Sequence, residues 1–591
     1  MADDSAGALT RRDALALTGG LLISGAAAAA PVGGEKPRID PEVQLLTSRS
    51  GVYTPPRGEA VMQFGFDFPE SSVRVGNFII GFRVHTFETV YALDPEKIKV
   101  TRGANAVAIM AEGFLGSGGQ EKAPGRLSAQ LNITADGVIE WQVRAEASSA
   151  IKSITTVVRG LPRGQLSVSG GDFADRGDDE KIFEYPQLFG GMSTPFIVLK
   201  DANGRLFELA ARQTAVRPAR FFFQPGPEGY RVELIHEHEG WARSSTIETC
   251  KWRVGPAASY ESAAAAHFAH VEKTYSIPRW ETRADAPAWM RDVSLVLSIH
   301  GAHWTGYIYN DYARALEILR WAATQIDPRN VLVFLPAWDG RYYWNYPLYR
   351  PDPRMGGVEG FKRLVGTAQK LGFHVAPMFG TNSANKSLPE FKAFADAVTE
   401  HIDGDAWDLN WVDWDNDRRN EGWMPFMNVG VASWRKWLGD KISAVISEFG
   451  VDAYFLDIAG AWENNRKADM YTGTVQLVAD VRSRHPGVPP IGEMLYDAQM
   501  SCIPMSQVTR YAQYPAGQDA YVRNYEHLSR PAPGRGSTGV HEAGFTRYKP
   551  DIAPAQRAIP TLSIVDDTFS QQREAMSAYI AQAKKWRQTK R

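Results

Sequence analysis

The 591-residue sequence has little of several features that mark particular classes of protein. Its only cysteines are Cys250 and Cys502, which excludes a disulfide-rich scaffold and a thiolate metal site, whether the two thiols are free or bridged to each other. The net charge is only −2, so no strong surface field predicts binding to nucleic acid or to an anionic membrane. After the first thirty residues no internal repeat or low-complexity segment is evident.

Aromatic residues, by contrast, are abundant, with 17 Trp, 22 Tyr and 27 Phe. Many will pack in cores, but Trp and Tyr also stack on sugars, whose C–H faces are apolar and whose rims are polar. With 44% hydrophobic residues, the chain can bury more than one core, and its length predicts two or three domains.

The first 31 residues have the pattern of an export signal. Arg11 and Arg12 precede an apolar run at 15–23, and a small-residue stretch at 25–30 ends at Pro31. The apolar run is far shorter than the ~20 residues that a membrane span needs. Paired arginines before such a run are typical of the twin-arginine route. We therefore expect a mature protein without a membrane span that is periplasmic or secreted.

Residues 40–280 predict an antiparallel β-sandwich domain. Turn signals separate short β-prone runs, and apolar residues mostly alternate with polar ones in the run that starts at Leu127. The expected strands are 73–88, 97–107, 125–133, 137–145 and 151–158. A linking helix is expected at 259–273, and Pro278 and Pro287 mark the end of the domain.

After residue 288 the pattern changes to strands that alternate with helices. The expected strands are 294–299, 331–335, 373–378, 453–457, 490–493, 508–512, 539–545 and 560–565. The expected helices are 311–325, 358–371, 434–449, 473–484 and 569–587. This alternation predicts a (β/α)8 barrel over 288–591. A doubly wound open sheet is the alternative, but no Gly-rich nucleotide loop follows its first strand.

Two acidic residues stand at the ends of consecutive expected strands. Asp457 ends the buried run 451–456, and Glu493 ends the next strand. The C-terminal ends of barrel strands carry the catalytic groups of such folds. A pair of carboxyl groups is the minimum for cleavage of a glycosidic bond. Asp457 could instead cap the next helix and Glu493 could form an ion pair, but their joint placement favours catalysis.

The segment from Trp434 to Asp457, followed by Ile491-Gly492-Glu493, resembles the central barrel of retaining α-glycosidases, namely the α-amylase group and the endo-α-N-acetylgalactosaminidases. In those enzymes an Asp nucleophile ends the fourth strand, a Glu acid/base ends the fifth, and a β-sandwich often precedes the barrel. The resemblance implies that Asp457 is the nucleophile and Glu493 the general acid/base. The α-amylase group has an Arg two residues before its nucleophile, where this chain has Phe455, so the substrate of that group is not implied.

Further side chains near the expected strand ends could contact a sugar. The aromatic loop at 338–346 follows the second strand and is expected to form a substrate wall, although a packed loop is the alternative. An insertion at 406–429 is too long for an ordinary loop and predicts a lid with Trp residues. The expected sugar contacts are Trp338, Asp339, Arg341, Trp344, His300, His303, Trp414, His541 and Asp566. A purely structural role is the alternative for each histidine at 300 and 303.

No cofactor or metal is expected. The acidic spacing at residues 413, 415 and 417 approaches that of a calcium loop, but Arg418 occupies the position of the required Gly, and Met424 the twelfth position. His236 and His238 could face one side of a strand, but no third ligand is identifiable.

The sequence therefore predicts an exported glycoside hydrolase that cleaves an α-linked oligo- or polysaccharide by a retaining, two-carboxylate mechanism. Its expected partner is a carbohydrate rather than a nucleic acid, and no feature specifies an oligomeric state. One alternative is a catalytically inactive carbohydrate-binding protein on the same scaffold. Another is a lyase or epimerase that uses a His or Tyr base.

Overall fold

The computed structural model describes nine segments of the chain: 39–49, 67–186, 191–303, 305–341, 344–406, 423–508, 516–526, 557–565 and 568–589. Several predictions fall outside the described residues. These are the export signal at 1–31, most of the expected lid with Trp414, and the expected sugar contacts His541 and Asp566.

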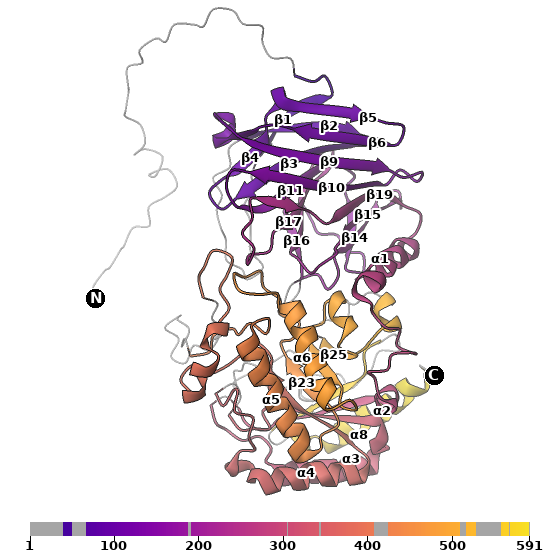
Figure 1. Ribbon diagram of the computed structural model, residues 1–591. Helices are drawn as coiled ribbons and strands as arrows, with labels where there is room; N and C mark the ends of the chain where they lie inside the picture. Colours follow the sequence, from indigo (N-terminus) through magenta and orange to yellow (C-terminus); the bar gives the residue numbers. More distant parts are fainter. Residues whose placement is uncertain are drawn as a thin grey trace, which may run out of the picture. The chain divides into compact units, whose positions relative to one another are not determined.

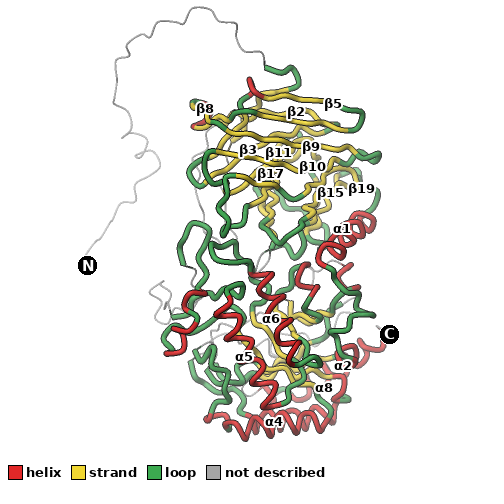
Figure 2. The backbone as a smooth tube through the Cα atoms, in the orientation of Figure 1, coloured by secondary structure: helices red, strands yellow, loops and turns green. Residues whose placement is uncertain are grey.

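Two antiparallel sheets come first along the chain (Figures 1 and 2). The ten-stranded sheet has the order β13 (Lys181–Tyr185), β16 (Ala219–Gly226), β17 (Gly229–Glu237), β11 (Ile151–Leu161), β3 (Phe78–Thr86), β4 (Val90–Leu93), β7 (Phe114–Gly116), β8 (Glu121–Ala123), with β2 (Asp67–Val75) beside β3 and β1 (Val43–Arg49) beside β2. The nine-stranded sheet has the order β12 (Gly164–Val168), β14 (Phe196–Asp201), β15 (Leu206–Arg212), β19 (Lys251–Ala257), β10 (Ile139–Ala147), β9 (Gly125–Ile133), β6 (Ala106–Ala111), β5 (Ile98–Arg102), and β18 (Thr246–Glu248) pairs with β10.

The two sheets pack through their apolar faces. In β9 buried and exposed residues alternate, as the sequence predicts for a half-buried strand. Trp141 of one sheet donates from Nε1 to Thr156 Oγ1 of the other at 3.2 Å, and Phe221 packs edge-on against Trp252. Two expected strands, 73–88 and 97–107, each prove to be a hairpin. In the first, Gly76 has a φ of +57° and allows the turn between β2 and β3.

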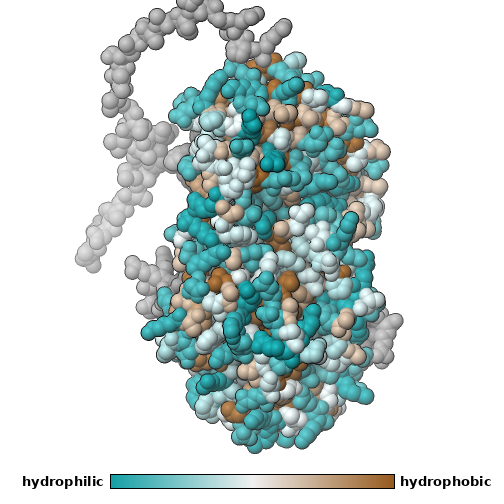
Figure 3. Space-filling view, in the orientation of Figure 1, coloured by the Kyte–Doolittle hydropathy of each residue, from teal (hydrophilic) through white to brown (hydrophobic). Residues whose placement is uncertain are grey.

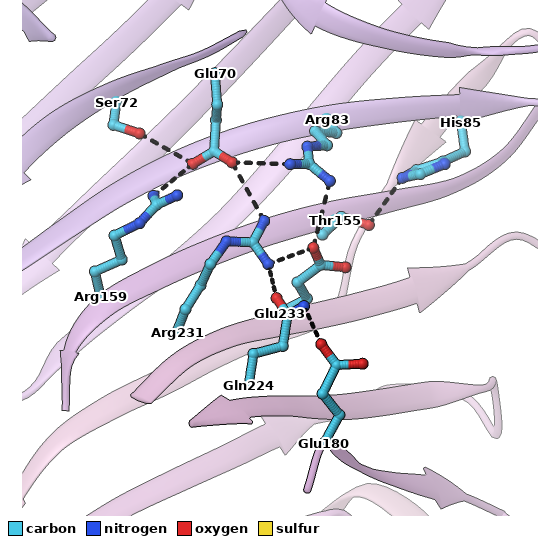
Figure 4. A network of polar contacts seen from close by, with 10 residues as sticks. All are labelled: Glu70, Ser72, Arg83, His85, Thr155, Arg159, Glu180, Gln224, Arg231 and Glu233. Carbon is cyan, nitrogen blue, oxygen red and sulfur yellow. Dashed lines mark hydrogen bonds and ion pairs between the residues drawn. The ribbon is translucent and has the colours of Figure 1, made fainter. Parts of the chain in front are cut away.

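The other face of the ten-stranded sheet carries an ion network (Figure 4). Glu70 is fully buried, and its carboxylate accepts hydrogen bonds from Arg159 at 2.8 Å and from Arg83 at 3.2 Å. Arg231 lies 3.4 Å from the same carboxylate. Burial alone would raise the pKa of Glu70, but Arg159, Arg83 and Arg231 outweigh burial and hold that pKa below its ordinary value.

Eight parallel strands follow, hydrogen-bonded in chain order. They are β20 (Leu295–Ile299), β21 (Val331–Leu335), β22 (His374–Gly380), β23 (Tyr454–Asp457), β24 (Pro490–Glu493), β25 (Met505–Val508), β26 (Arg523–Glu526) and β27 (Thr561–Ile564). The last strand, β27, pairs with the first, β20. A single bridge between Tyr525 of β26 and Ile559, just before β27, nearly closes the barrel.

The α-helices of the described chain are α1 (Tyr260–Tyr275), α2 (Ala288–Asp292), α3 (Tyr312–Gln325), α4 (Gly357–Leu371), α5 (Ala432–Phe449), α6 (Met470–Arg484), α7 (Thr568–Gln571) and α8 (Arg573–Thr589). The first, α1, packs against β14, β15 and β19 of the nine-stranded sheet, and later helices lie around part of the barrel (Figures 1 and 2). Gly372 and Gly450 adopt left-handed conformations that end α4 and α5. Short 3-10 helices in the described chain are η1 (Pro95–Lys97), η2 (Ser117–Gly119), η3 (Pro328–Asn330), η4 (Pro353–Met355), η5 (Pro389–Ala393), η6 (Ala395–Ala397), η7 (Asp497–Ser501) and η9 (Ala516–Ala520).

The second half of the barrel departs from the regular alternation that the sequence predicts. In the described residues, β24 and β25 are followed by the 3-10 helices η7 and η9 instead of α-helices. The connection 494–504 is shorter than a parallel crossover with an α-helix requires. The sixth strand is β25, not 508–512, and β26 takes the seventh place that was expected at 539–545, a segment outside the described residues.

Cys250 and Cys502 are both buried free thiols, so no bridge joins them. Burial raises the pKa of Cys502 to about 12, which keeps this thiol protonated. Hydrophobic side chains on the face seen in Figure 3 are scattered among hydrophilic ones. Across the described ranges, no helix combines the length and the apolar character needed to cross a bilayer.

Candidate active site

Three aromatic rings identify the interior face of the barrel. The ring of Phe455 in β23 lies 4.3 Å from that of Phe334 in β21, and Phe334 lies 6.5 Å from Tyr525 in β26. None of these strands are neighbours, so the rings meet inside the barrel. Alternate residues of a strand share a face, and Asp457 therefore points to the same side as Phe455, at the C-terminal end of the barrel.

The strand register places Asp457 and Glu493 at one level. The last registered pair of β23 and β24 is Leu456 with Gly492, and each carboxylate is the next residue on its strand. The backbones of neighbouring strands lie about 4.8 Å apart, so residues at equivalent positions are adjacent. Asp457 and Glu493 are each 4% exposed. The structure therefore brings together the two residues that the sequence predicts to be catalytic.

The same register extends this level around the barrel. Glu493 pairs with Gln507 of β25, and Gln507 pairs with Tyr525 of β26. Burial raises the pKa of the Tyr525 hydroxyl, and the negative charge of Glu493 raises it further. Gln507 and Tyr525 were not predicted as site residues, because their strands, β25 and β26, were expected elsewhere in the sequence.

The backbone that follows Asp457 holds the side chain of Glu493. The Ile458 N–H donates to Glu493 Oε2 at 2.7 Å, and the Gly460 N–H donates to the Glu493 carbonyl at 2.7 Å. Asn382, directly beyond β22, donates to the Ile458 carbonyl at 3.0 Å. A Cβ at Gly460 would lie 1.4 Å from the Met494 carbonyl, so only glycine permits this approach. The two strand ends are thus joined directly.

Both carboxylates precede a residue in the left-handed conformation. Ile458 has a φ of +48° and Met494 a φ of +59°. This conformation is a clear outlier for a β-branched residue such as Ile458. Backbone strain of this kind costs about 1–3 kcal/mol per residue and clusters at functional sites.

Asp339 is a buried carboxylate on the loop after β21. It is 1% exposed, and neither carboxylate oxygen has a hydrogen-bond partner among the described residues. Burial raises the pKa of Asp339 to about 7, and the negative charge of Asp352 adds to the shift. Burial, Asp339 and Asp457 all raise the pKa of Tyr349, so both carboxylates lie close enough to act on this hydroxyl.

The expected substrate wall and the expected lid meet at two indole rings. Trp344, on the loop after β21, lies 4.9 Å from Trp423, near the end of the insertion. The guanidinium of Arg341 lies 4.1 Å above the Trp344 ring in a cation–π contact. Asn385 donates to the Trp344 carbonyl at 2.8 Å and ties this loop to the segment after β22.

Trp338 differs from the expectation that it contacts a sugar. Its Nε1 donates to the Met378 carbonyl at 2.9 Å, and its ring stacks on Phe361 of α4 at 4.6 Å. It is only 2% exposed. Trp338 therefore belongs to the core between the barrel and α4.

His300 and His303 follow β20, and both are buried. The His300 N–H donates to the Ile564 carbonyl at 3.2 Å, so its backbone continues the pairing of β20 with β27. His303 Nδ1 lies 2.8 Å from Thr305 Oγ1, and its ring packs edge-on against Tyr309. These contacts agree with the structural role that the sequence left open for His303.

His236 and His238 each contact a different protein group and do not share a set of ligands that could hold a metal. His238 Nε2 lies 3.1 Å from the Thr246 carbonyl, and His236 Nδ1 accepts the Cys250 N–H at 3.4 Å. Burial lowers the pKa of His236 to about 3, so this imidazole is neutral. No group of three or more His, Cys, Asp or Glu in the described part of the chain is placed to hold a metal. The acidic positions 413, 415 and 417 lie outside the described residues.

No protein-family model matches the chain, and no curated protein matches its sequence. Solved structures do match. A ligand-free α-N-acetylgalactosaminidase from Bifidobacterium bifidum has a TM-score of 0.62 at 12% identity, covering 88% of this chain and 91% of that one. Its complex with GalNAc has a TM-score of 0.59 at 12% identity, covering 79% and 83%. A GH36 α-galactosidase from Geobacillus stearothermophilus has a TM-score of 0.47 at 12% identity, covering 93% and 76%.

The two matches to the α-N-acetylgalactosaminidase show that this chain shares the fold of that enzyme. In this chain the fold consists of antiparallel sheets followed by a nearly closed parallel barrel.

Proposed function

We propose that this chain is a hydrolase of α-linked glycosides, with Asp457 as nucleophile and Glu493 as general acid/base. One observation carries the proposal: two buried carboxylates follow the last registered pair of adjacent strands, at the C-terminal end of a glycosidase-like barrel. Catalytic groups occupy this end in such barrels.

The proposed reaction has two steps. Asp457 attacks the anomeric carbon as the glycosidic C–O bond breaks, and Glu493 gives its proton to the departing oxygen. Glu493 then takes a proton from water, whose oxygen attacks the same carbon and releases Asp457. The hydrogen bond from Ile458 N–H to Glu493 Oε2 orients the acid/base group in both steps.

Two further features suit a sugar ligand. Asp339 offers two buried oxygens without partners in the described structure, and sugar hydroxyls are donors for such acceptors. The Trp344 ring, backed by Trp423, offers an apolar face for stacking. Because a similarly folded enzyme is an α-N-acetylgalactosaminidase with a GalNAc complex, we propose an aryl α-N-acetylgalactosaminide as the first substrate to test.

We also propose export by the twin-arginine route, which Arg11→Lys with Arg12→Lys should block.

Activity of two isosteric variants tests the proposal. Asp457→Asn removes the proposed nucleophile and should abolish most activity on both an aryl and a methyl α-glycoside. Glu493→Gln should lower kcat/KM on the methyl α-glycoside, whose leaving group needs a proton, by roughly 10²–10⁴-fold, the contribution of a single proton-transfer group. Their melting temperatures should stay near that of the wild type. NMR detection of the first anomer released should show retention of configuration.

Asp452→Asn is the matched control. Asp452 lies before the other end of β23, where its carboxylate accepts the Val375 N–H at 2.8 Å. Its substitution should leave kcat unchanged, and any effect should fall on stability. Full activity of Asp457→Asn on either substrate, or of Glu493→Gln on the methyl α-glycoside, would refute the proposal. Sugar binding by calorimetry without turnover would instead indicate a carbohydrate-binding protein. Loss of activity in His300→Ala with Asp457→Asn harmless would indicate lyase or epimerase chemistry.

A further inference from the structure

Each catalytic strand end continues into a loop that is fastened to the antiparallel sheets. The loop after β23 contains Asn464, and the loop after β24 contains Asp497. Asn464 is 5% exposed and Asp497 is 1% exposed. Both are buried polar side chains whose hydrogen bonds reach residues before the barrel.

Asn464 satisfies its amide with the end of β17. Its Nδ2 donates to Glu237 Oε1 at 2.8 Å and to the His238 carbonyl at 2.7 Å. Its Oδ1 accepts the Gly240 N–H at 2.8 Å. A buried amide with three bonds to one segment fixes both its position and its orientation. The loop that starts at Asp457 is therefore held by the ten-stranded sheet.

Asp497 lies four residues beyond Glu493 and forms hydrogen bonds with β13 and with the segment before β14. Oδ1 accepts from the Tyr185 hydroxyl at 2.6 Å, and Oδ2 accepts from the Thr194 hydroxyl at 2.7 Å. The Asp497 N–H donates to the Ser193 carbonyl at 2.8 Å. Bonds to a carboxylate are the strong kind, which suits a contact that has to fix a loop.

His267, Thr194 and Asp497 form a chain of hydrogen bonds in which the position of each proton follows from the next acceptor. Because the Thr194 hydroxyl proton goes to Asp497, the His267 Nε2 that lies 2.6 Å from Thr194 Oγ1 acts as a donor. Burial lowers the pKa of His267, so the ring is neutral with its proton on Nε2. Helix α1, the segment before β14 and the end of β13 thus converge on one carboxylate. Burial raises the pKa of Asp497 only to about 6, so it is mostly ionised at neutral pH.

The barrel holds the loop after β24 by single hydrogen bonds, such as the one from the Met494 N–H to the Gln507 carbonyl at 2.8 Å. The connection from β24 to β25 has no α-helix and contains only η7, which begins at Asp497. Between Glu493 and Asp497 lies Met494, in its left-handed conformation. The Gly460 contact with the Glu493 carbonyl joins this loop to the one after β23. A shift of either loop would therefore move both carboxylates.

We propose that Asn464 and Asp497 are positioning residues, through which the antiparallel sheets set the direction of the Asp457 and Glu493 side chains. The inference rests on the proposed roles of Asp457 and Glu493. It assigns the sheets a part in catalysis although they contribute no reacting group.

Substitutions within the sheets test this remote effect. Thr194→Val removes the hydroxyl between His267 and Asp497 and keeps the shape of the side chain. It should lower kcat by up to about 10²-fold, the cost of a small misplacement of reacting groups, with little change in KM. Thr194→Ser, which retains the hydroxyl, should restore most of the lost activity. Thr156→Val is the matched control, because the buried Thr156 hydroxyl bonds only within the sheets, to Trp141.

The dependence of kcat/KM on the leaving group distinguishes the contribution of Asp497 from that of Asn464. Asp497 lies on the loop of the proposed acid, so Thr194→Val should lower kcat/KM more for a methyl α-glycoside than for the 4-nitrophenyl α-glycoside of the same sugar, whose leaving group needs little protonation. Asn464→Asp, on the loop of the proposed nucleophile, should lower kcat/KM for both substrates equally. Equal kcat for wild type and Thr194→Val, or equal losses in Thr194→Val and Thr156→Val, would overturn the inference.

Amide hydrogen exchange gives an answer that needs no turnover. Thr194→Val should speed exchange at Ile458 and Gly460, whose N–H groups bond to Glu493, whereas Thr156→Val should not. Unchanged exchange at these amides would overturn the positioning role even if the wild type cleaved no glycoside. Conversely, faster exchange in a protein without activity would retain the positional coupling and reject the proposed function alone.

Discussion

Two fully enclosed carboxylates, one in the antiparallel sheets and one at the barrel rim, have opposite surroundings. Glu70 is surrounded by Arg83, Arg159 and Arg231, and its pKa lies below the ordinary value despite burial. Asp339 has no partner for either oxygen in the described chain, and burial raises its pKa to about 7. Protein groups satisfy the Glu70 carboxylate, whereas the Asp339 oxygens can still accept hydrogen bonds.

This difference separates structural from functional burial. Unsatisfied buried polar groups are costly, so a protein that keeps one usually has a use for it. By this criterion the Glu70 carboxylate in Figure 4 serves the fold, and Asp339 is the carboxylate that we propose for a ligand.

Glu70→Ala should produce the largest loss of stability. Removal of one partner from a buried ion network typically costs about 3–5 kcal/mol. Here Arg83, Arg159 and Arg231 would lose the carboxylate that they share, and Glu233 would still pair with Arg83 and Arg231. Urea unfolding should show this decrease, and activity per folded molecule should be unchanged. Asp178→Asn is the control, since Asp178 pairs with Arg163 at an exposed site and should contribute about 0–1 kcal/mol. Equal effects of the two substitutions would remove the contrast.

Asp339→Asn should have the reverse effect, with more stability and less activity. Below pH 3.8 the carboxyl is protonated in both states; as the pH rises, the unfolded chain ionises first, and the folded state loses stability until about pH 7. A shift from 3.8 to about 7 corresponds to a penalty of up to about 4 kcal/mol above pH 7.

Unfolding curves at pH 4 and pH 8 should therefore show the gain of Asp339→Asn mainly at pH 8. A lost bond from a sugar hydroxyl to a charged acceptor should lower kcat/KM by about 10- to 10²-fold. Equal stability of Asp339→Asn and wild type at pH 8 would show that the carboxylate has a stabilising partner.

Trp338 and Trp344 should separate packing from substrate contact within one loop. Trp338→Phe leaves the Met378 carbonyl without its donor and should cost about 1–3 kcal/mol of stability with KM unchanged. Trp344→Ala should raise KM by about 2- to 10-fold through loss of ring stacking. Thermal melts and initial rates measure both effects, and a KM effect in Trp338→Phe would contradict its assignment to the core.

Tyr525→Phe should have the smallest effect on stability. The Tyr525 hydroxyl is buried and has no hydrogen-bond partner among the described residues, so its removal should change stability by less than about 1 kcal/mol or increase it. Initial rates should fall if the hydroxyl contacts the sugar beside Glu493. A large drop in melting temperature would contradict the absence of a partner.

The sequence predicted the barrel strands best where burial is complete. The expected strands 331–335 and 490–493 coincide with β21 and β24, and both are buried throughout. The sixth and seventh strands were misplaced because β25 and β26 carry polar residues such as Ser506, Gln507 and Asn524, which interrupt the apolar run that marks a strand.

The candidate site was predictable only where a residue type and a strand end coincide. That rule found Asp457 and Glu493. Trp338 and Trp344 lie in the same aromatic loop, and composition cannot show that one packs on Phe361 of a later helix. Asn464 and Asp497 were not anticipated, because their partners lie more than two hundred residues earlier in the chain. Contacts of that range follow from the assembled fold, not from local pattern.

The left-handed residues Ile458 and Met494 have a consequence for engineering. Glycine adopts their φ values of +48° and +59° without strain, so Ile458→Gly or Met494→Gly would relax the chain beside each carboxylate. Both side chains are buried, with Ile458 2% and Met494 8% exposed, so such a change would also leave a cavity beside Asp457 or Glu493 and loosen the orientation of both carboxylates. Thermostable libraries of this protein should therefore keep positions 458 and 494 constant.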